Sequence, residues 1–309
     1  MGTTSVVQIR NLTKRIGNKT LVSGLTFDIP KGEVFGFLGP NGAGKTTTIR
    51  MMVGLMKITE GQVLIKGKDV EKDFEAAMTE VGAIVENPEM YKFISGYDNL
   101  VHFSRMHKNV GKERIDEVIR LVGLENRIHD KVKTYSLGMR QRLGLAQALL
   151  HKPSVLILDE PTNGLDPAGI RELRDHLRML AKQEGLSVIV SSHLLSEMEL
   201  MCDRIAVIQN GKLIDVKPVR EMVGEEDQTV VSFDVSNAEE AVKLMQQIVD
   251  QQTDITVQAD VVEVALTRDQ IAEVNRQLVL AGINVYGIRT VTKSLEDRFL
   301  EMTGSGQIV

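Results

Sequence analysis

Residues 39–47 constrain the fold of this 309-residue chain more than any other stretch. They match the pattern G-x-x-x-x-G-K-S/T, in which the backbone N–H groups of a glycine-rich loop surround phosphate oxygens. The apolar residues 34–38 predict a buried strand before the loop, and residues 47–55 predict a helix after it. A strand, a glycine loop and a helix N-terminus form an anion site, because unpaired N–H groups and the helix dipole converge there. The chain is therefore predicted to bind a nucleoside triphosphate.

The residue types in this loop indicate how it would hold a nucleotide. Its glycines allow the close approach of phosphate and the positive φ angles that a Cβ would hinder. The ammonium group of Lys45 would reach the β- and γ-phosphates, and the hydroxyl of Thr46 would ligate Mg²⁺. An ordinary glycine turn is the alternative, which the flanking strand and helix disfavour. The predicted ATP-binding residues of the loop are Gly39, Pro40, Asn41, Gly42, Ala43, Gly44, Lys45, Thr46 and Thr47.

Composition limits what the chain is expected to do. A formal net charge of −5 disfavours a broad nucleic-acid-binding face. No apolar run approaches the ~20 residues of a membrane-spanning helix, and the N-terminus lacks the apolar segment of a signal peptide. We therefore expect a cytosolic protein that reaches a membrane only through a partner. The one cysteine, Cys202, is expected to be a small buried apolar group in a reducing compartment.

Hydrophobic patterns predict an α/β domain over residues 1–223. Short strands at 6–11 and 25–29 indicate a small antiparallel β subdomain beside the phosphate-loop core. Residues 87–150 change to helical spacing and are expected to form a helical subdomain. The apolar run 154–158 then predicts a parallel strand that is covered on both faces.

The pattern restarts after an acidic stretch at residues 224–227, so a second domain is expected over 228–309. Two strand–helix–strand units follow each other there, which predicts a small α+β domain of the ferredoxin-like kind. A last helix is expected over 295–302. This domain has no metal-ligand spacing, no nucleophile elbow and no basic stripe, so dimerisation or regulation is its expected role.

Polar residues follow the predicted parallel strands where each strand ends. Asp159 and Glu160 close one apolar strand, and His193 follows the strand at 186–190. Parallel strands bring their carboxyl ends to one edge of a sheet, where ligands bind. Asp159 would hold Mg²⁺ at this edge, and Glu160 would orient or deprotonate the water that attacks the γ-phosphate. A solvated acidic loop and a structural histidine are the alternatives.

Together these motifs resemble those of the nucleotide-binding subunit of an ABC transporter, a family of P-loop NTPases. Residues 39–47 match the family's Walker A motif, 155–160 its Walker B motif and 163–166 its D-loop. His193 matches its switch histidine, and the resemblance covers about residues 4–222.

The resemblance implies a mechanism. Lys45, Glu160 and His193 would be the catalytic residues, and Mg²⁺ would bind with ATP on Thr46 and Asp159. The products would be ADP and phosphate.

A second anion site is predicted where the family has its signature motif. Ser136 is expected to cap the following helix, so that its hydroxyl and nearby N–H groups form this site; a simple capped helix is the alternative. In the family the signature binds the γ-phosphate held by the other subunit, which implies a head-to-tail homodimer on ATP binding. Asp166 would couple the two sites across that interface. The signature residues are Ser136, Leu137, Gly138 and Met139.

Besides Leu137 and Met139, which replace a glycine and the glutamine of the family's signature, two further positions depart from the family pattern. Glu86 stands in place of the Q-loop glutamine; a carboxylate can still ligate Mg²⁺ but adds negative charge near the phosphates. Ile16 stands where the family has an adenine-stacking aromatic residue, which predicts van der Waals contact with the base and weak discrimination between purine nucleotides. These departures and the C-terminal domain resemble the bacitracin-resistance type of exporter ATPase. Tyr91 and Phe93 lie in the segment that matches the family's contact site for the coupling helix of the permease. The alternative is that both aromatic residues belong to the core of the helical subdomain.

The sequence thus predicts an ATPase that drives export of an antibiotic peptide or amphiphile through separate integral-membrane permease subunits. It would lie in the cytoplasm, on the inner face of the cell membrane. One alternative is a soluble ABC ATPase that acts on a non-membrane partner, although neither a second cassette nor a long coiled-coil insertion is found. The other is a nucleotide-gated binding module that does not hydrolyse ATP.

Overall fold

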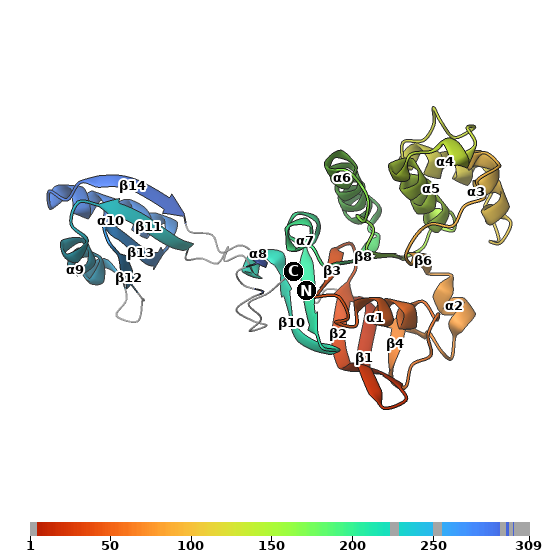
Figure 1. Ribbon diagram of the computed structural model, residues 1–309, viewed down its shortest axis with the longest axis horizontal. Coiled ribbons are helices and arrows are strands. Elements are labelled where there is room, and N and C mark those ends of the chain that lie inside the picture. The colour runs from red at the N-terminus through yellow and green to blue at the C-terminus, as the bar shows by residue number, and fades with distance from the viewer. Residues whose placement is uncertain (1–4, 223–228, 250–254, 291–294, 297–298, 300–309) are drawn as a thin grey trace. The chain divides into compact units, whose positions relative to one another are not determined.

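The computed structural model describes residues 5–222, 229–249, 255–290, 295–296 and 299 (Figure 1). The chain divides into two compact units, and the division between them falls after Lys217. The boundary expected at residues 224–227 lies outside the described residues, as does most of the helix expected over 295–302. Each unit has its own hydrophobic core.

The first unit is built on a six-stranded sheet. Its strands β3 (Val34–Leu38), β7 (Val155–Asp159) and β8 (Ser187–Ser192) are buried along their whole length. β3 and β7 both run parallel to β8, so the three strands end at the same edge of the sheet. The remaining strands are β6 (Val81–Ile84), β9 (Arg204–Gln209) and β10 (Lys212–Pro218), and the order is β10-β9-β3-β8-β7-β6.

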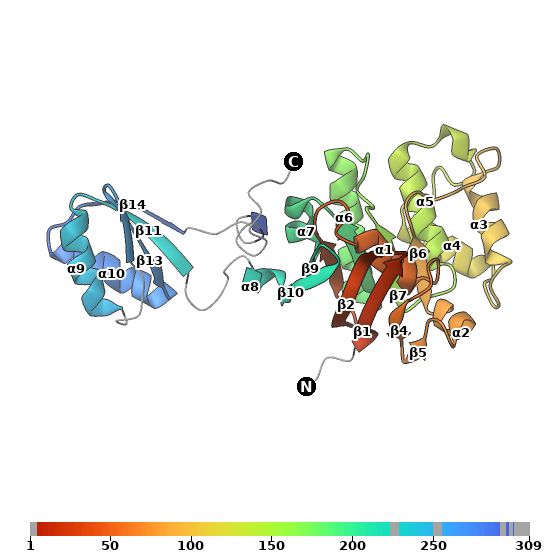
Figure 2. The same ribbon diagram turned by 60° about the horizontal axis from the view of Figure 1, so that its bottom comes forward.

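The expected antiparallel layer is present as a four-stranded sheet, with the order β2-β1-β4-β5 (Figure 2). β1 and β2 are longer than their patterns predict, because register shifts such as that between Ile9 and Leu12 break the alternation of buried and exposed residues. Helix α1 packs with both sheets, since its Ile49 joins Ile9 and Phe37 in one apolar cluster. The elements are β1 (Ser5–Ile16), β2 (Lys19–Pro30), α1 (Lys45–Met52), β4 (Glu60–Ile65) and β5 (Lys68–Asp69).

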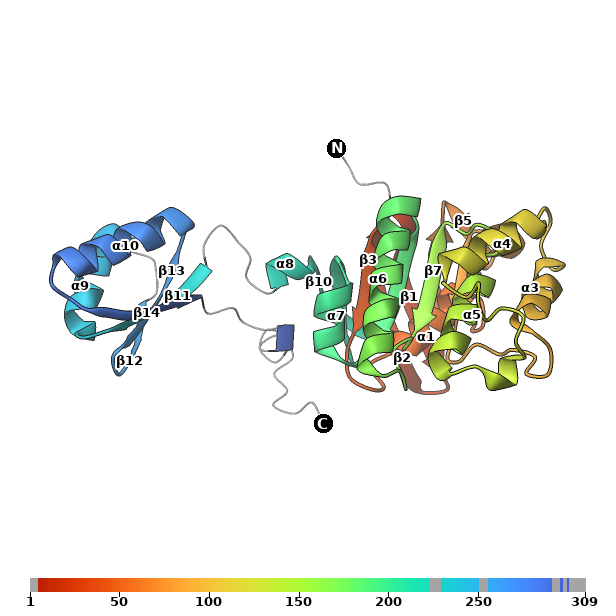
Figure 3. The same cartoon turned by 90° about the horizontal axis from the view of Figure 1, so that it is seen from above.

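Helices α6 (Pro167–Glu184) and α7 (Leu195–Met201) contact β3 and β8 of the parallel sheet (Figure 3). Between β6 and β7 the chain forms three helices that pack on one another, and α5 also contacts β6 (Figure 1). These helices are α3 (Gly96–Ser104), α4 (Lys112–Leu121) and α5 (Leu137–Leu149), with a 3-10 turn η1 (Val132–Thr134) before α5. They correspond to the helical subdomain that the sequence predicts.

The second unit contains a four-stranded antiparallel sheet with the order β12-β13-β11-β14. Helices α9 and α10 lie side by side and contact the sheet (Figure 3). The ferredoxin-like prediction is therefore confirmed. α10 begins with a capping box, which Thr267 and Gln270 form. The elements are β11 (Thr229–Val235), α9 (Ala238–Ile248), β12 (Ile255–Gln258), β13 (Val261–Leu266), α10 (Arg268–Leu280) and β14 (Val285–Thr290).

Three short helices were not expected from the sequence: α2 (Phe74–Met78), α7 and α8 (Val219–Met222). Each has at most two turns, which is too few residues to show a 3.6-residue period. Cys202 is buried as expected, and burial raises the pKa of its thiol. None of the helices in the described residues combines the length and the hydrophobicity that a membrane-spanning helix needs.

Candidate nucleotide-binding site

The loop between β3 and α1 has a backbone shape that only glycine permits at two positions. A Cβ on Gly39 would lie 2.1 Å from the carbonyl oxygen of Ile208, so no larger residue fits. Gly44 caps the N-terminus of α1 with a φ of 109°, a conformation that L side chains rarely adopt. The loop therefore presents its backbone to the space above the N-terminus of α1, as the sequence pattern predicts.

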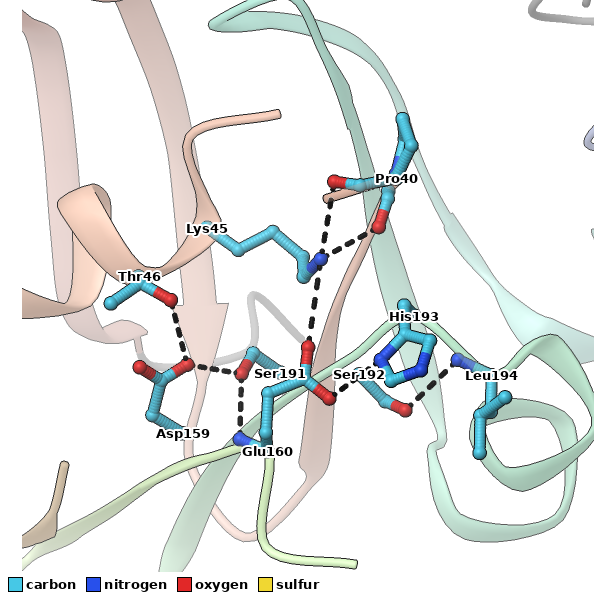
Figure 4. Close-up of polar contacts among 10 residues, drawn as sticks. Pro40, Lys45, Thr46, Asp159, Glu160, Ser191, Ser192, His193 and Leu194 are labelled. Carbon is cyan, nitrogen blue, oxygen red and sulfur yellow. Dashed lines mark hydrogen bonds and ion pairs between the residues drawn. The ribbon is translucent and has the colours of Figure 1, made fainter. Parts of the chain in front are cut away.

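Lys45 lies at the centre of the site, and its side chain is only 5% exposed. Its Nζ donates hydrogen bonds to the carbonyl oxygens of Gly39 at 2.6 Å and Pro40 at 3.3 Å (Figure 4). The same nitrogen lies 3.6 Å from Oε1 of Glu160. Burial lowers the pKa of the Lys45 ammonium, and the nearby Glu160 carboxylate opposes that shift. Lys45 thus joins the phosphate loop to the end of β7.

The hydroxyl of Thr46 and the carboxylate of Asp159 face each other across the site. Thr46 Oγ1 donates to Asp159 Oδ1 at 3.3 Å, and Ser191 Oγ donates to the same oxygen at 2.5 Å (Figure 4). A hydroxyl and a carboxylate are hard oxygen donors of the kind that Mg²⁺ prefers. These two residues therefore fit the magnesium site that the family resemblance implies.

Glu160 bridges two partners with its two carboxylate oxygens. Oε1 faces Lys45, and Oε2 lies 3.0 Å from Nδ1 of His193 (Figure 4). His193 comes from the loop after β8, so the ends of β7 and β8 meet through these side chains. A carboxylate held between a lysine and a histidine at a sheet edge is well oriented to accept a proton from water.

The side chains of Lys45, Glu160 and His193 line a cavity of about 650 Å³, a size within the usual range of ligand pockets. The sequence did not predict the contribution of Lys19, Thr20 and Leu21 at the start of β2, nor that of Asn210. Asn210 lies in the two-residue turn between β9 and β10, where the N–H of Gly211 donates a hydrogen bond to the carbonyl oxygen of Ala43. The lining residues are Lys19, Thr20, Leu21, Asn41, Gly42, Ala43, Gly44, Lys45, Thr46, Thr47, Glu160, Asn163, His193 and Asn210.

Glu86 and Ile16 are not among the residues that line this cavity. The carboxylate of Glu86 is paired with the guanidinium of Arg50, in the last turn of α1. Ile16 is 55% exposed at the end of β1. The contact of Glu86 with Mg²⁺ and the contact of Ile16 with the nucleotide base therefore stay predictions.

The signature residues and Asp166 also lie outside the cavity of their own chain, and both polar side chains cap helices. Ser136 Oγ accepts from the N–H of Met139 at 3.2 Å, at the start of α5. Asp166 Oδ1 accepts from the N–H of Gly169 at 2.8 Å, at the start of α6. The two helix starts are neighbours, since a Cβ on Gly164 would meet the side chain of Leu137 at 2.9 Å.

Known proteins similar to this chain are ABC transporter proteins, most of them ATP-binding proteins. The ABC transporter family model matches residues 22–163. YhcH of Bacillus subtilis (strain 168), an uncharacterised ABC transporter ATP-binding protein, is 59% identical over 97% of this chain and 96% of its own length. The bacitracin transport ATP-binding protein BcrA of Bacillus licheniformis is 39% identical over 98% of this chain and 99% of its own length.

A solved structure shows the same fold over most of the chain. CbiO1 from Clostridium perfringens, part of the ABC transporter complex cbiONQ, is 26% identical with a TM-score of 0.66. The match covers 72% of this chain and 91% of that one. The relatives, by contrast, match nearly the whole length, including the second unit. The chain therefore belongs to the family of ABC transporter ATP-binding proteins.

Proposed function

We propose that the protein hydrolyses ATP to ADP and phosphate in this cavity. The observation that carries the proposal is the Glu160 carboxylate, held between Lys45 at 3.6 Å and His193 at 3.0 Å beside the phosphate loop. A module that only binds nucleotide needs the loop and Lys45 but has no use for an oriented base at this position. Hydrolysis is therefore favoured over the non-hydrolysing alternative.

The residues divide the reaction between them. The N–H groups of the loop and the Lys45 ammonium bind the phosphate oxygens, and Glu160 accepts the proton of the attacking water. The water oxygen then bonds to the γ-phosphorus as the bond to the bridging oxygen breaks, which releases ADP. His193 holds the Glu160 carboxylate in place. Mg²⁺, held by Thr46 and Asp159, would neutralise negative charge on the β- and γ-phosphates.

We further propose that two copies of the chain bind ATP between them, head to tail. Support comes from Ser136 and Asp166, which lie outside the cavity of their own chain. The start of α5 offers a hydroxyl and helix N–H groups suited to a phosphate held by the other copy. Each site would then be completed only when two copies meet.

The partner that this ATPase moves is proposed to be a separate membrane permease that exports an antibiotic peptide or amphiphile. The name of BcrA, a bacitracin transport protein, supports the cargo class. A groove of about 510 Å³ around Tyr91 and Phe93 supports the docking surface. Phe93 is 80% exposed and Tyr91 54%, so neither is a subdomain core residue. Clustered exposed aromatic residues indicate an interaction site. The protein would then sit on the inner face of the membrane.

Glu160→Gln tests the proposed hydrolysis. The amide keeps the size and polarity of the side chain but cannot accept the proton, so we expect turnover to fall by about 10²–10⁴-fold. Binding of ATP is expected to persist, and ATP-trapped dimers are expected to accumulate in size-exclusion chromatography. Unchanged hydrolysis in this variant would remove Glu160 from the mechanism. A wild-type chain that binds ATP without turnover would instead favour the binding module.

A further inference from the structure

Ser191, at the carboxyl end of β8, makes two hydrogen bonds to the end of β7. Its side chain is completely buried. The hydroxyl donates to Oδ1 of Asp159 at 2.5 Å and accepts from the backbone N–H of Glu160 at 2.9 Å (Figure 4). A serine hydroxyl can donate and accept at the same time, and both capacities are used here. One small side chain therefore contacts both acidic residues of the site.

The backbone at Glu160 explains why this contact matters. Along a regular strand, neighbouring side chains point to opposite faces of the sheet. Glu160 instead has a φ of 50°, in the left-handed region that glutamate rarely adopts. With this turn Asp159 reaches Thr46 at 3.3 Å and Glu160 reaches Lys45 at 3.6 Å. The hydroxyl of Ser191 accepts a hydrogen bond from the backbone N–H of Glu160, the residue with this unfavourable φ angle.

We propose that Ser191 is a positioning residue for ATP hydrolysis, an inference that rests on the function proposed above. Its donated hydrogen bond directs Asp159 toward the metal, and its accepted hydrogen bond fixes the turn that directs Glu160 toward the water. Without the hydroxyl, the N–H of Glu160 loses this acceptor, and of the two hydrogen bonds to Asp159 Oδ1 the longer one from Thr46 remains. Both acidic side chains would then be less well oriented, although neither has been replaced.

Ser187 on the same strand provides a matched control. It is also completely buried, and its hydroxyl also makes two hydrogen bonds. It donates to the carbonyl oxygen of Pro30 and accepts from the N–H of Gly32, each at 3.1 Å. It stands at the opposite end of β8 and does not line the cavity. Ser187→Ala therefore removes an equivalent buried hydroxyl without touching either acidic residue.

The experiment compares Ser191→Ala and Ser187→Ala in the full-length chain. We expect Ser191→Ala to lower kcat, and to weaken Mn²⁺ binding to the ADP-loaded protein, by about 10- to 100-fold each, as for other residues that orient metal ligands. Mn²⁺ binding is measured by electron paramagnetic resonance, which does not depend on turnover. Ser187→Ala should reduce thermal stability to a similar degree and leave kcat and Mn²⁺ affinity unchanged.

Ser191→Cys serves if the alanine variant does not fold. Cysteine keeps a side-chain atom in the place of the hydroxyl oxygen but is a weak donor and acceptor, so the same losses are expected. The inference is overturned if the folded Ser191 variants match Ser187→Ala in both kcat and Mn²⁺ affinity. A wild-type chain without turnover would overturn the proposed function alone, because the Mn²⁺ measurement would still show whether Ser191 orients Asp159.

Discussion

The strand ends and the helix starts of the first unit hold their polar residues in different ways. The strand-end residues Asp159, Glu160 and His193 contact one another or the phosphate loop within a single chain. The helix-start residues Ser136 and Asp166 contact only their own helices among the hydrogen bonds described, and neither lines the cavity. A parallel sheet delivers its strand ends to one edge, whereas a helix cap satisfies itself locally. This difference underlies our proposal that the strand ends bind ATP in their own chain and that the starts of α5 and α6 act on ATP held by a second copy.

The largest effect is expected from Lys45→Ala, in the phosphate loop that the strand-end residues contact. Because the ammonium is buried and would be paired with phosphate, its loss should cost about 2–5 kcal/mol of ATP-binding free energy. Isothermal titration calorimetry measures the change. Lys152→Ala is the control, since that side chain is 67% exposed and does not line the cavity. Equal losses of ATP-binding free energy in the two variants would contradict the proposal that the Lys45 ammonium binds the phosphates.

A smaller effect, of a different kind, is expected at the helix-start side from Ser136→Ala. Turnover should fall by about 10²-fold, as when one donor to a developing negative charge is removed. ATP binding by the separate chain should not change, because Ser136 does not line its cavity. Steady-state kinetics and calorimetry distinguish the two quantities.

Ser95→Ala is the matched control for this prediction. Ser95 also caps a helix of the same subdomain, and its hydroxyl accepts from the N–H of Asp98 at 3.0 Å. Both substitutions should lower the free energy of unfolding by about 1 kcal/mol, the usual cost of a lost serine cap. If Ser95→Ala reduced turnover as much as Ser136→Ala, the effect would be one of stability and not of phosphate binding.

The smallest effect is expected from Glu86→Gln, a position that belongs to neither group. Its ion pair with Arg50 is exposed to solvent, with side chains 64% and 37% accessible, so its loss should cost only about 0–1 kcal/mol of stability. The Mg²⁺ concentration for half-maximal turnover should not change. Glu60→Gln, which breaks the similarly exposed pair with Arg15, is the control. A clear shift in the Mg²⁺ requirement with Glu86→Gln alone would place that carboxylate at the metal.

The sequence predicts the parts of the site that follow local rules. The loop, the strand before it and the acidic pair after β7 are each contiguous, and parallel strands make their convergence predictable. The contribution of Lys19 and Leu21 was missed, since it depends on how β2 packs beside the loop. The role of Ser191 was missed because it follows from the left-handed backbone of Glu160, which no residue pattern signals.

Other differences come from contacts that sequence spacing does not reveal. The ion pair of Glu86 with Arg50 joins the loop after β6 to helix α1, which are far apart in the sequence. The full lengths of β1 and β2 were hidden by register shifts, whereas the ferredoxin-like order of the second unit was predictable from its alternating strands and helices. A role for the second unit in dimerisation or regulation stays a prediction.

Mixing two inactive variants tests most directly the claim that each copy supplies half of a site. Lys45→Ala and Ser136→Ala chains are each purified, then combined, and ATP hydrolysis is measured against the mixing ratio. If the phosphate loop of one chain and the signature of the other form each site, a mixed dimer contains one site in which both halves are native. Turnover should then reappear and be highest when the two variants are mixed in about equal amounts. If both halves act within one chain, no mixed site is intact, and turnover that stays at the level of the separate variants would contradict the account.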